Sequence, residues 1–322
     1  MNSREKLKEL YNSQLNEQLL SLESQRKTIV KRHSISALIL ILGILLIAIG
    51  NQLDTKILIT SGIVSIILSL ITFLSSNKKE KIYKSDFKNN VVKKIITHID
   101  PDWSYEPKSF INKVEYLQSG LFTTPWDKYR GDDLIHGIIE KTDFRLSELH
   151  TEYKTVSKDS KGNSTESWNT IFKGLFAHAD FNKKIKGKTY VLPDVAENLF
   201  GKWGQKLQRN DSRGELVKLE NLEFEKNFVV YSDDQIEARY ILTPKMMEAI
   251  VNIKKQLKEE IYISFIESRV YIAISIHNDL FEPRIFNSGV RFLDIEDMYF
   301  YFNIISVVIK EMNLNTRIWT KE

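Results

Sequence analysis

The sequence predicts an α+β protein in which an N-terminal helix and a transmembrane helical hairpin precede a mainly antiparallel α+β cytoplasmic domain. Uncharged apolar runs at residues 34–50 and 57–74, only six residues apart, predict the hairpin. Alternating apolar segments dominate the middle of the remaining chain and predict strands. Because helical segments come before, within and after these strands, the pattern favours α+β over a parallel doubly wound sheet.

The two apolar runs have the length of membrane-spanning helices. About 18 apolar residues cross the roughly 30 Å hydrocarbon core, where the backbone must be helical because lipid offers no hydrogen bonds. One alternative is a buried helical hairpin in a soluble protein. A cleaved signal peptide is the other, but the polar residues 1–33 come first and a second run follows at once. We therefore assign residues 34–76 to a two-helix transmembrane hairpin.

Basic residues gather at both outer ends of the hairpin and give its orientation, because Lys and Arg resist translocation. The connecting loop has only Lys56. The flanking residues that we expect at anionic lipid headgroups are Arg26, Lys27, Lys31, Arg32, Lys78, Lys79, Lys81 and Lys84. The pattern predicts two spans in the bacterial inner (cytoplasmic) membrane, with both termini cytoplasmic.

Composition excludes several classes of function. The chain has no cysteine, which rules out disulfides, cysteine metal sites and thiol catalysis. Its net charge of +4 is modest, and we find no recognition helix, aromatic stacking motif or strongly basic domain. We expect no nucleic-acid partner and predict no cofactor and no resident metal.

Residues 1–33 read as a polar, coiled-coil-like helix. Leu15, Leu22 and Ile29 are spaced by seven. Three alternatives stay open for this stripe: self-association, packing against the protein's own domain, or binding of another protein. Residues 77–100 form a basic juxtamembrane segment and helix, and residues 101–322 form the cytoplasmic domain.

Within that domain, the strand-like segments share apolar alternation and bounding turn residues. They are residues 113–118, 143–156, 168–181, 188–192, 216–219, 228–231, 260–266 and 269–276. A helix should begin at Pro244 with Thr243 as its cap. Another should run from Ile295 to Met312, capped by Asp294.

The run Phe224–Met247, FEKNFVVYSDDQIEARYILTPKMM, resembles the hallmark of a bacterial family of membrane-anchored proteins of unknown function. Further similar segments are Tyr129–Asp133, Phe172–Phe176, Ala179–Phe181 and Lys186–Thr189. The family combines two N-terminal transmembrane helices with a cytoplasmic domain. The resemblance implies a bacterial source and a tethered domain, but no established activity and no catalytic residues.

Four polar residues are the candidates for catalysis. Asp132 and Asp133 lie at an expected helix start, where carboxylates are favoured as caps. His178 and Asp180 are two apart on an expected strand, so their side chains share a face. Either pair has a plain structural explanation, in a cap or on the surface. Together the pairs would hold a metal for a hydrolase.

Glu237 and Arg239 are the candidates for recognition of a ligand or partner. An ion pair that ties their segment to the following helix is one explanation. A recognition pocket is the other, because Arg binds carboxylates through two hydrogen bonds.

These observations favour a role without catalysis: a membrane-tethered cytoplasmic interaction or sensory module that binds a protein partner or ligand at the inner membrane face. The alternative is a metal-dependent, membrane-associated hydrolase that uses Asp132, Asp133, His178 and Asp180.

Overall fold

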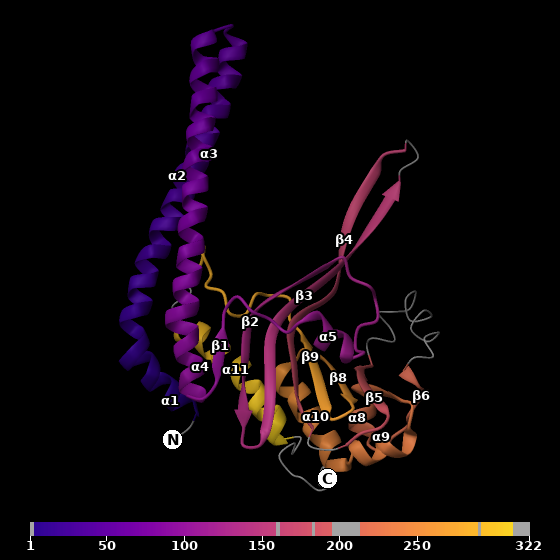
Figure 1. Cartoon of the computed structure of the whole chain (residues 1–322). Coiled ribbons are helices and arrows are strands. Elements are labelled where there is room, and N and C mark those ends of the chain that lie inside the picture. Colours follow the sequence, from indigo (N-terminus) through magenta and orange to yellow (C-terminus); the bar gives the residue numbers. More distant parts are fainter. Residues whose placement is uncertain (1–2, 159–161, 182–183, 195–212, 289–290, 312–322) are drawn as a thin grey trace. The chain divides into compact units, whose positions relative to one another are not determined.

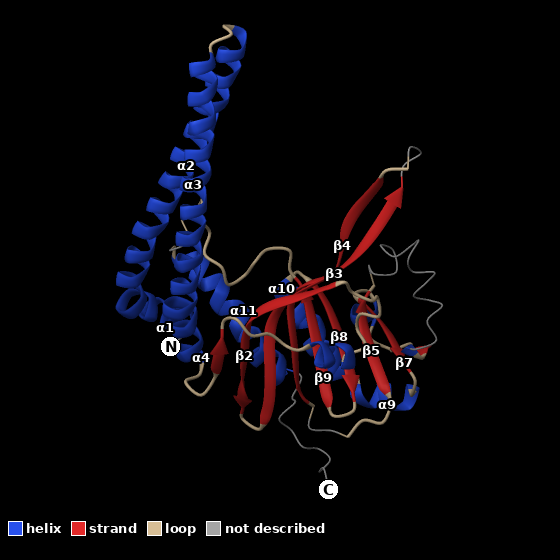
Figure 2. Ribbon diagram, turned by 45° about the horizontal axis from the view of Figure 1, so that its top comes forward, coloured by secondary structure: helices blue, strands red, loops and turns tan. Residues whose placement is uncertain are grey.

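The computed structural model describes residues 3–158, 162–181, 184–194, 213–288 and 291–311. The chain divides into two compact units. Unit 1 contains Met1–Ile99 and Leu280–Phe300, and unit 2 contains Asp100–Asp279 and Tyr301–Glu322. Long helices followed by an antiparallel sheet with further helices confirm the predicted α+β class (Figures 1 and 2).

Unit 1 is built on two long helices that lie side by side (Figure 1). Its elements are α1 (Ser3–Leu10), the π-type turn η1 (Tyr11–Leu15), α2 (Asn16–Gln52), α3 (Lys56–Phe87), the π-type turn η2 (Lys88–Val92) and α4 (Lys93–Ile99). Helix α2 continues through residue 33 without a break, so the polar helix and the first apolar run are one rod. At 1.5 Å per residue its length is about 55 Å, which exceeds the hydrocarbon core.

Small residues line the contact between α2 and α3 inside the apolar runs. Ser36 Oγ donates to Ser69 O at 2.9 Å, and Ser69 Oγ donates to Ser36 O at 2.8 Å. Gly43 lies seven residues after Ser36, and Gly62 lies seven residues before Ser69. A Cβ atom on Gly62 would lie only 2.7 Å from Gly43 O. The backbones therefore approach so closely that only glycine fits there.

The spacing of buried positions continues this contact beyond the apolar runs. On α2, buried residues recur every seven positions, at Leu22, Ile29, Ser36, Gly43 and Gly50. On α3 the same spacing gives Gly62, Ser69, Ser76 and Tyr83. Seven residues are close to two helical turns, so each series stays on one side of its helix. We call this contact the hairpin seam.

The outer surfaces of the same helices are large and apolar. Each helix contains an 18-residue apolar window, and only 17% and 11% of the residues in these windows are buried. A core helix of a soluble protein would be mostly buried. Both helices are therefore long and apolar enough to cross a membrane.

Unit 2 contains a nine-stranded antiparallel sheet in the order β1-β2-β3-β4-β9-β8-β5-β7-β6 (Figure 2). The strands are β1 (Ser104–Glu106), β2 (Lys128–Ile139), β3 (Thr142–Lys158), β4 (Ser164–Asp180), β5 (Lys188–Pro193), β6 (Glu215–Leu216), β7 (Phe228–Ser232), β8 (Glu260–Ile266) and β9 (Arg269–Ser275). Six of the eight expected strands are confirmed, with shifts of their ends, and the expected strand at residues 216–219 overlaps β6 only at Leu216. An aromatic core on one side of the sheet includes Tyr116, Phe172, Phe176, Tyr190 and Tyr271.

The expected strand at residues 113–118 is wrong, because these residues form helix α5 (Lys113–Gln118). Asn112 accepts from the backbone of Val114 and Glu115, and the Glu115 side chain accepts from the Asn112 amide. This capping box fixes a helix start that apolar alternation does not reveal.

The other helices are α8 (Leu222–Glu225), α9 (Gln235–Ile241), α10 (Pro244–Leu257) and α11 (Phe292–Glu311). Thr243 caps α10 as expected, through a 3.3 Å bond from the Met246 amide. Helix α11 starts earlier than expected, so Asp294 lies in its first turn, where it binds Arg291. Met312, the expected end of this helix, lies outside the described residues.

Strands β3 and β4 extend past the rest of the sheet. Strand β2 pairs with β3 as far as Glu152, and β9 pairs with β4 only from Gly174 onward. The outer parts of β3 and β4, from Tyr153 to Lys158 and from Ser164 to Asn169, pair with each other alone. They form a projecting two-stranded ribbon (Figures 1 and 2).

The serine contact in the hairpin seam can be tested by oxidation. In the double variant Ser36→Cys/Ser69→Cys, we expect an internal disulfide after mild oxidation of membranes, because the two Oγ atoms are 3.1 Å apart. The native chain has no cysteine, so the thiols that remain reactive to a maleimide polymer report the bond without background. The matched pair Leu38→Cys/Ile67→Cys, at exposed positions, should stay reduced. Equal oxidation of both pairs would contradict the seam.

Candidate functional site

Asp132 and Asp133 do not start a helix, contrary to expectation: both lie within strand β2. The register against β3 shifts between Asp132 and Ile135, which makes a β-bulge. Asp133 has a φ of 57°, in the left-handed region that Asp adopts more readily than most residues. A Gly-Asp-Asp sequence is typical of a turn, and here the turn chemistry serves a bulge inside a strand.

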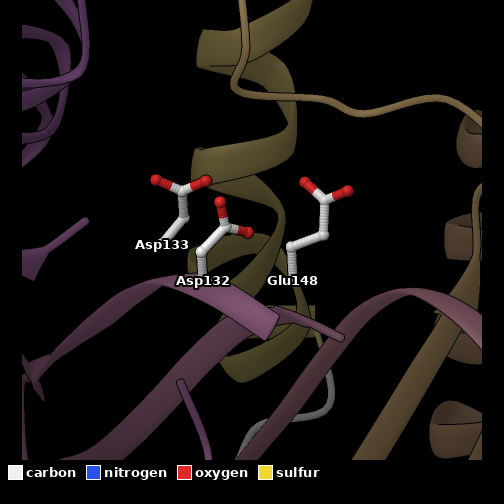
Figure 3. A group of neighbouring side chains, drawn as sticks. All are labelled: Asp132, Asp133 and Glu148. Atoms are coloured by element: carbon white, nitrogen blue, oxygen red, sulfur yellow. The ribbon is translucent and has the colours of Figure 1, made fainter. Parts of the chain in front are cut away.

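The bulge brings three carboxyl groups together (Figure 3). Asp132 pairs directly across from Glu148 on β3, and ligand oxygens of Asp132, Asp133 and Glu148 all lie within 4.8 Å of one another. Asp133 and Glu148 are buried, and Asp133 accepts a hydrogen bond from the Tyr105 hydroxyl. Clustered carboxylate oxygens suit a hard divalent cation such as Mg²⁺, Ca²⁺ or Mn²⁺. We call Asp132, Asp133 and Glu148 the acidic trio.

His178 and Asp180 lie elsewhere, so the structure does not bring the two predicted pairs together. His178 pairs across from Arg145 on β3, three residues before Glu148. Three residues along a strand are about 10 Å and reverse the face, because side chains alternate. The acidic trio and His178 therefore occupy opposite faces of the sheet.

His178 is buried, and the charged side chains around it are partly exposed. Its Nδ1 accepts from Arg269 Nε at 3.2 Å, which places the ring proton on Nε2, 3.4 Å from Glu115 Oε1. Arg145 binds the same Glu115 oxygen at 2.9 Å. Burial, with smaller effects of Arg269 and Arg145, lowers the pKa of His178 to about 3. The imidazole is neutral at physiological pH, and among the described contacts its Nε2 has no hydrogen-bond partner although Glu115 Oε1 is 3.4 Å away.

Arg269 also binds Asp143 on β3, with Nη2 2.6 Å from the carboxylate. Asp180 pairs across from Arg269 in the sheet register. These contacts tie β3, β4 and β9 together through side chains as well as through the backbone. They give the predicted His178 and Asp180 face a structural explanation.

Glu237 and Arg239 point to different partners. The Glu237 carboxylate accepts from the Lys186 amide at 3.0 Å and from the Gly187 amide at 2.7 Å. Asp233 accepts from the Lys188 amide at 2.6 Å. Arg239 donates to the carbonyl oxygens of Gln235 and Lys218. Glu237 therefore fixes the loop before β5, and among the described contacts it forms no ion pair with Arg239.

The basic residues beside the apolar runs divide into two groups. Lys27, Lys31, Lys78, Lys79 and Lys81 are exposed, whereas Arg32 is half-buried. Arg26 binds Glu23, and Lys84 binds Glu80 and Glu282. Lys27 lies 3.9 Å from Glu23. Among the described contacts, Lys31, Arg32, Lys78, Lys79 and Lys81 form no such ion pair.

The sequence did not predict two residues that contribute to these clusters, Glu148 in the acidic trio and Glu115 beside His178. Glu148 is buried and shares a face of β3 with Leu146 and Phe144, two and four residues before it, so a charge in an apolar series was the available signal. Glu115 was read as part of a strand, and its role depends on the helix that replaces that strand.

Comparison with known proteins gives a family match over part of the chain. Residues 170–314 match the family described as "Protein of unknown function (DUF3137)". This covers less than half of the sequence and includes the run Phe224–Met247 on which the family resemblance was based. It supports likeness to an uncharacterised family and brings no activity. No curated protein matches the chain.

A solved structure is also similar. It is described as the crystal structure of the mycobacterial trehalose monomycolate transport factor A, TtfA. The match is 9% identical in sequence, covers 67% of this chain and 93% of that chain, and has a TM-score of 0.33. Likeness at this level carries no conclusion about function.

The neutral state of His178 predicts acid-sensitive stability. Because its pKa of about 3 in the fold lies below the value of about 6.5 in an unfolded chain, stability is complete above pH 6.5 and is lost as pH falls toward 3. Between pH 7 and pH 5 the loss from this group should be on the order of 2 kcal/mol. Thermal unfolding of the full chain in detergent at the two pH values measures it.

The matched variant is His178→Gln, whose amide does not titrate but retains a donor and an acceptor. Its unfolding temperature should change less between pH 7 and pH 5 than that of the native chain. An unchanged pH dependence in the variant would show that other groups carry the effect.

Proposed function

We propose that the chain is a membrane-tethered interaction module, in which α2 and α3 span the bacterial inner membrane and unit 2 binds a protein partner at the cytoplasmic face. The observation that carries the proposal is the exposure of the two apolar helices. Only 17% and 11% of the residues in their apolar windows are buried. Exposing these apolar side chains to water is unfavourable, whereas lipid tails are as apolar as the side chains and can surround them.

The distribution of side-chain sizes supports lipid as the surrounding solvent. Small residues of the hairpin seam face the partner helix, and large ones face outward. Outward side chains that are more than half exposed include Leu38, Ile41, Ile57, Val64, Ile67, Leu70 and Leu74. Helix association in lipid relies on such close backbone contact, because there is no hydrophobic gain from burying leucine between helices.

Charge supports the orientation. Residues Leu53–Thr55 make a short turn between the helices, with Lys56 as the first residue of α3. The exposed lysines Lys31, Lys78, Lys79 and Lys81 lie at the opposite ends of the apolar runs. Each lysine near an anionic surface contributes about 1 kcal/mol. Both termini are therefore placed on the cytoplasmic side in this proposal.

The projecting ribbon of β3 and β4 supports a binding role for unit 2. Val156 is 57% exposed and Trp168 is 41% exposed, and the Lys128 ammonium lies 3.2 Å from the centre of the Trp168 ring. Tryptophan is enriched in protein interfaces and among the residues that carry most of their binding energy. By contrast, Leu15, Leu22 and Ile29 of the N-terminal helix are buried within the chain. The ribbon is accordingly our first choice of partner surface.

Single cysteines test the proposed topology. Asn51→Cys, beside the hairpin turn, should react with a membrane-impermeant maleimide on intact cells or spheroplasts. Val156→Cys, on the ribbon, should react only after the membrane is opened, because unit 2 lies inside. Labelling of both cysteines from one side would overturn the proposed topology.

The same Val156→Cys variant tests the binding role when its thiol carries a photo-crosslinker. In native membranes it should capture one protein in a stoichiometric yield. Leu222→Cys is the matched control, at an exposed apolar position of α8 outside the ribbon. Equal capture by the two variants, or no capture by either, would contradict recognition through the ribbon.

A second candidate, a metal-dependent hydrolase, is favoured only by the acidic trio and no longer includes His178 or Asp180. If it is correct, the full chain should bind Mn²⁺, and Glu148→Gln should weaken binding at least about tenfold by removing one anionic ligand. Titration followed by the electron paramagnetic resonance of free Mn²⁺ measures this. Glu166→Gln, on the ribbon, is the control. The absence of Mn²⁺ binding by the native chain would eliminate this candidate.

A further inference from the structure

A segment far along the sequence belongs to the same compact unit as the hairpin. Residues Leu280–Phe300 are part of unit 1 together with Met1–Ile99. Two of its contacts are polar and involve residues just outside the apolar runs, Arg26 before the first run and Lys84 after the second. Glu282 binds Lys84 of α3 at 2.7 Å, and the carbonyl oxygen of Ile285 accepts from Arg26 of α2 at 2.7 Å. We call residues 280–288 the strap.

The next residue of the strap reaches the end of the apolar runs. The Phe286 ring lies 6.2 Å from the ring of His33, which in turn lies 5.6 Å from the ring of Phe73. His33 directly precedes the first apolar run, and Phe73 is the last residue but one of the second run. Phe286 is therefore held at the level where both runs meet their basic flanks.

Phe286 is exposed although its apolar neighbours in the strap are not. Its exposed fraction is 75%, whereas Phe281 is 0% and Ile285 is 9% exposed. The strap thus buries two apolar side chains and presents a third outward. Arg284 and Asn287 beside it are also exposed. A protruding aromatic residue flanked by polar ones is the pattern of a side chain that enters the interfacial layer of a bilayer.

From this geometry we infer that the strap is a third membrane contact, with Phe286 inserted at the lipid interface beside α2 and α3 and Arg284 near the headgroups. The inference rests on the proposed spanning hairpin. Lipid is the occupant that the structure favours, because the Phe286 ring lies beside His33, whose ring contacts the exposed Phe73 at the end of the second apolar run. Exposed Lys31 and Lys78 at the same level complement anionic headgroups.

The contact would bring a distant part of the chain to the membrane. The strap begins immediately after Asp279, which belongs to unit 2, and Tyr301 returns the chain to unit 2. The cytoplasmic domain is then linked to the bilayer through a second stretch of chain in addition to the stretch that follows α4. Lipid composition at the inner surface could in this way act on residues between β9 and α11.

Spin labels on single cysteines test the contact in the full-length chain, reconstituted in vesicles of phosphatidylcholine and phosphatidylglycerol. The three variants are Phe286→Cys, Ile67→Cys in the middle of the second run, and Leu222→Cys in unit 2. All three native side chains are at least half exposed, so the substitutions should leave the fold intact. Collision rates with oxygen, which prefers lipid, and with a water-soluble nickel chelate are compared.

The label at position 286 should show an oxygen-to-nickel collision ratio several-fold above that at position 222 and below that at position 67. A ratio at 286 equal to that at 222, with a lipid-like value at 67, would overturn the strap contact and leave the hairpin anchor standing. A water-like ratio at 67 would instead overturn the anchor, and the strap contact with it. Hydrogen exchange of residues 280–288, slower in vesicles than in detergent, provides a second readout.

Discussion

The close contact between α2 and α3 is the constraint from which the architecture of unit 1 follows. Ser36 and Ser69 each donate to the other's backbone carbonyl, and Gly43 and Gly62 let the two backbones approach closely. In lipid, such contacts are the main source of helix association. Because the small residues are directed inward, most of the large apolar side chains are left outward, and the same arrangement that joins the helices leaves an exposed apolar surface on a pair long enough to cross a membrane.

Several charged residues of unit 2 connect its helices, strands and loops through ion pairs and hydrogen bonds. Arg145 binds Glu115 and so joins α5 to the sheet, Arg269 binds His178 across β4 and β9, and Glu237 accepts two backbone amides from the loop before β5. A carboxylate that accepts two amides, or a neutral imidazole between an arginine and a glutamate, is a structural use of groups that also serve in catalysis. In the acidic trio the carboxyl groups also converge on one another, while Asp133 accepts from the Tyr105 hydroxyl.

Local patterns in the sequence were sufficient for the elements that depend on local physics. The hairpin follows from two apolar runs, α10 from the Thr243 and Pro244 signal, and β8 and β9 from alternation around a short turn. The helix α5 was missed because Val114, Tyr116 and Leu117 resemble a strand unless the cap made by Asn112 is recognised.

The site was harder to predict, since it depends on register. Asp132 and Glu148 meet because β2 pairs with β3 at one particular offset, and the bulge at Asp133 adds a third carboxyl group. The hypothesis that His178 lies near Asp132 and Asp133 was wrong, because the spacing of residues along one strand does not show which side of the sheet the residues of another strand occupy. The sequence also did not predict the strap, because its contacts with Arg26 and Lys84 join residues far apart in the sequence.

In the proposed membrane-spanning role, the repeat of seven in the hairpin seam also limits how the hairpin can adapt to bilayers of different thickness. One residue inserted into α2 alone would rotate every later seam position by about 100° and put leucine where Gly43 now meets Gly62. A length change keeps both series in place only when it adds or removes seven residues in each helix, a step of about 10 Å. Smaller differences in thickness must be met by tilting the pair as a whole. The length of the hairpin can therefore change only in steps of seven residues, made in both helices together.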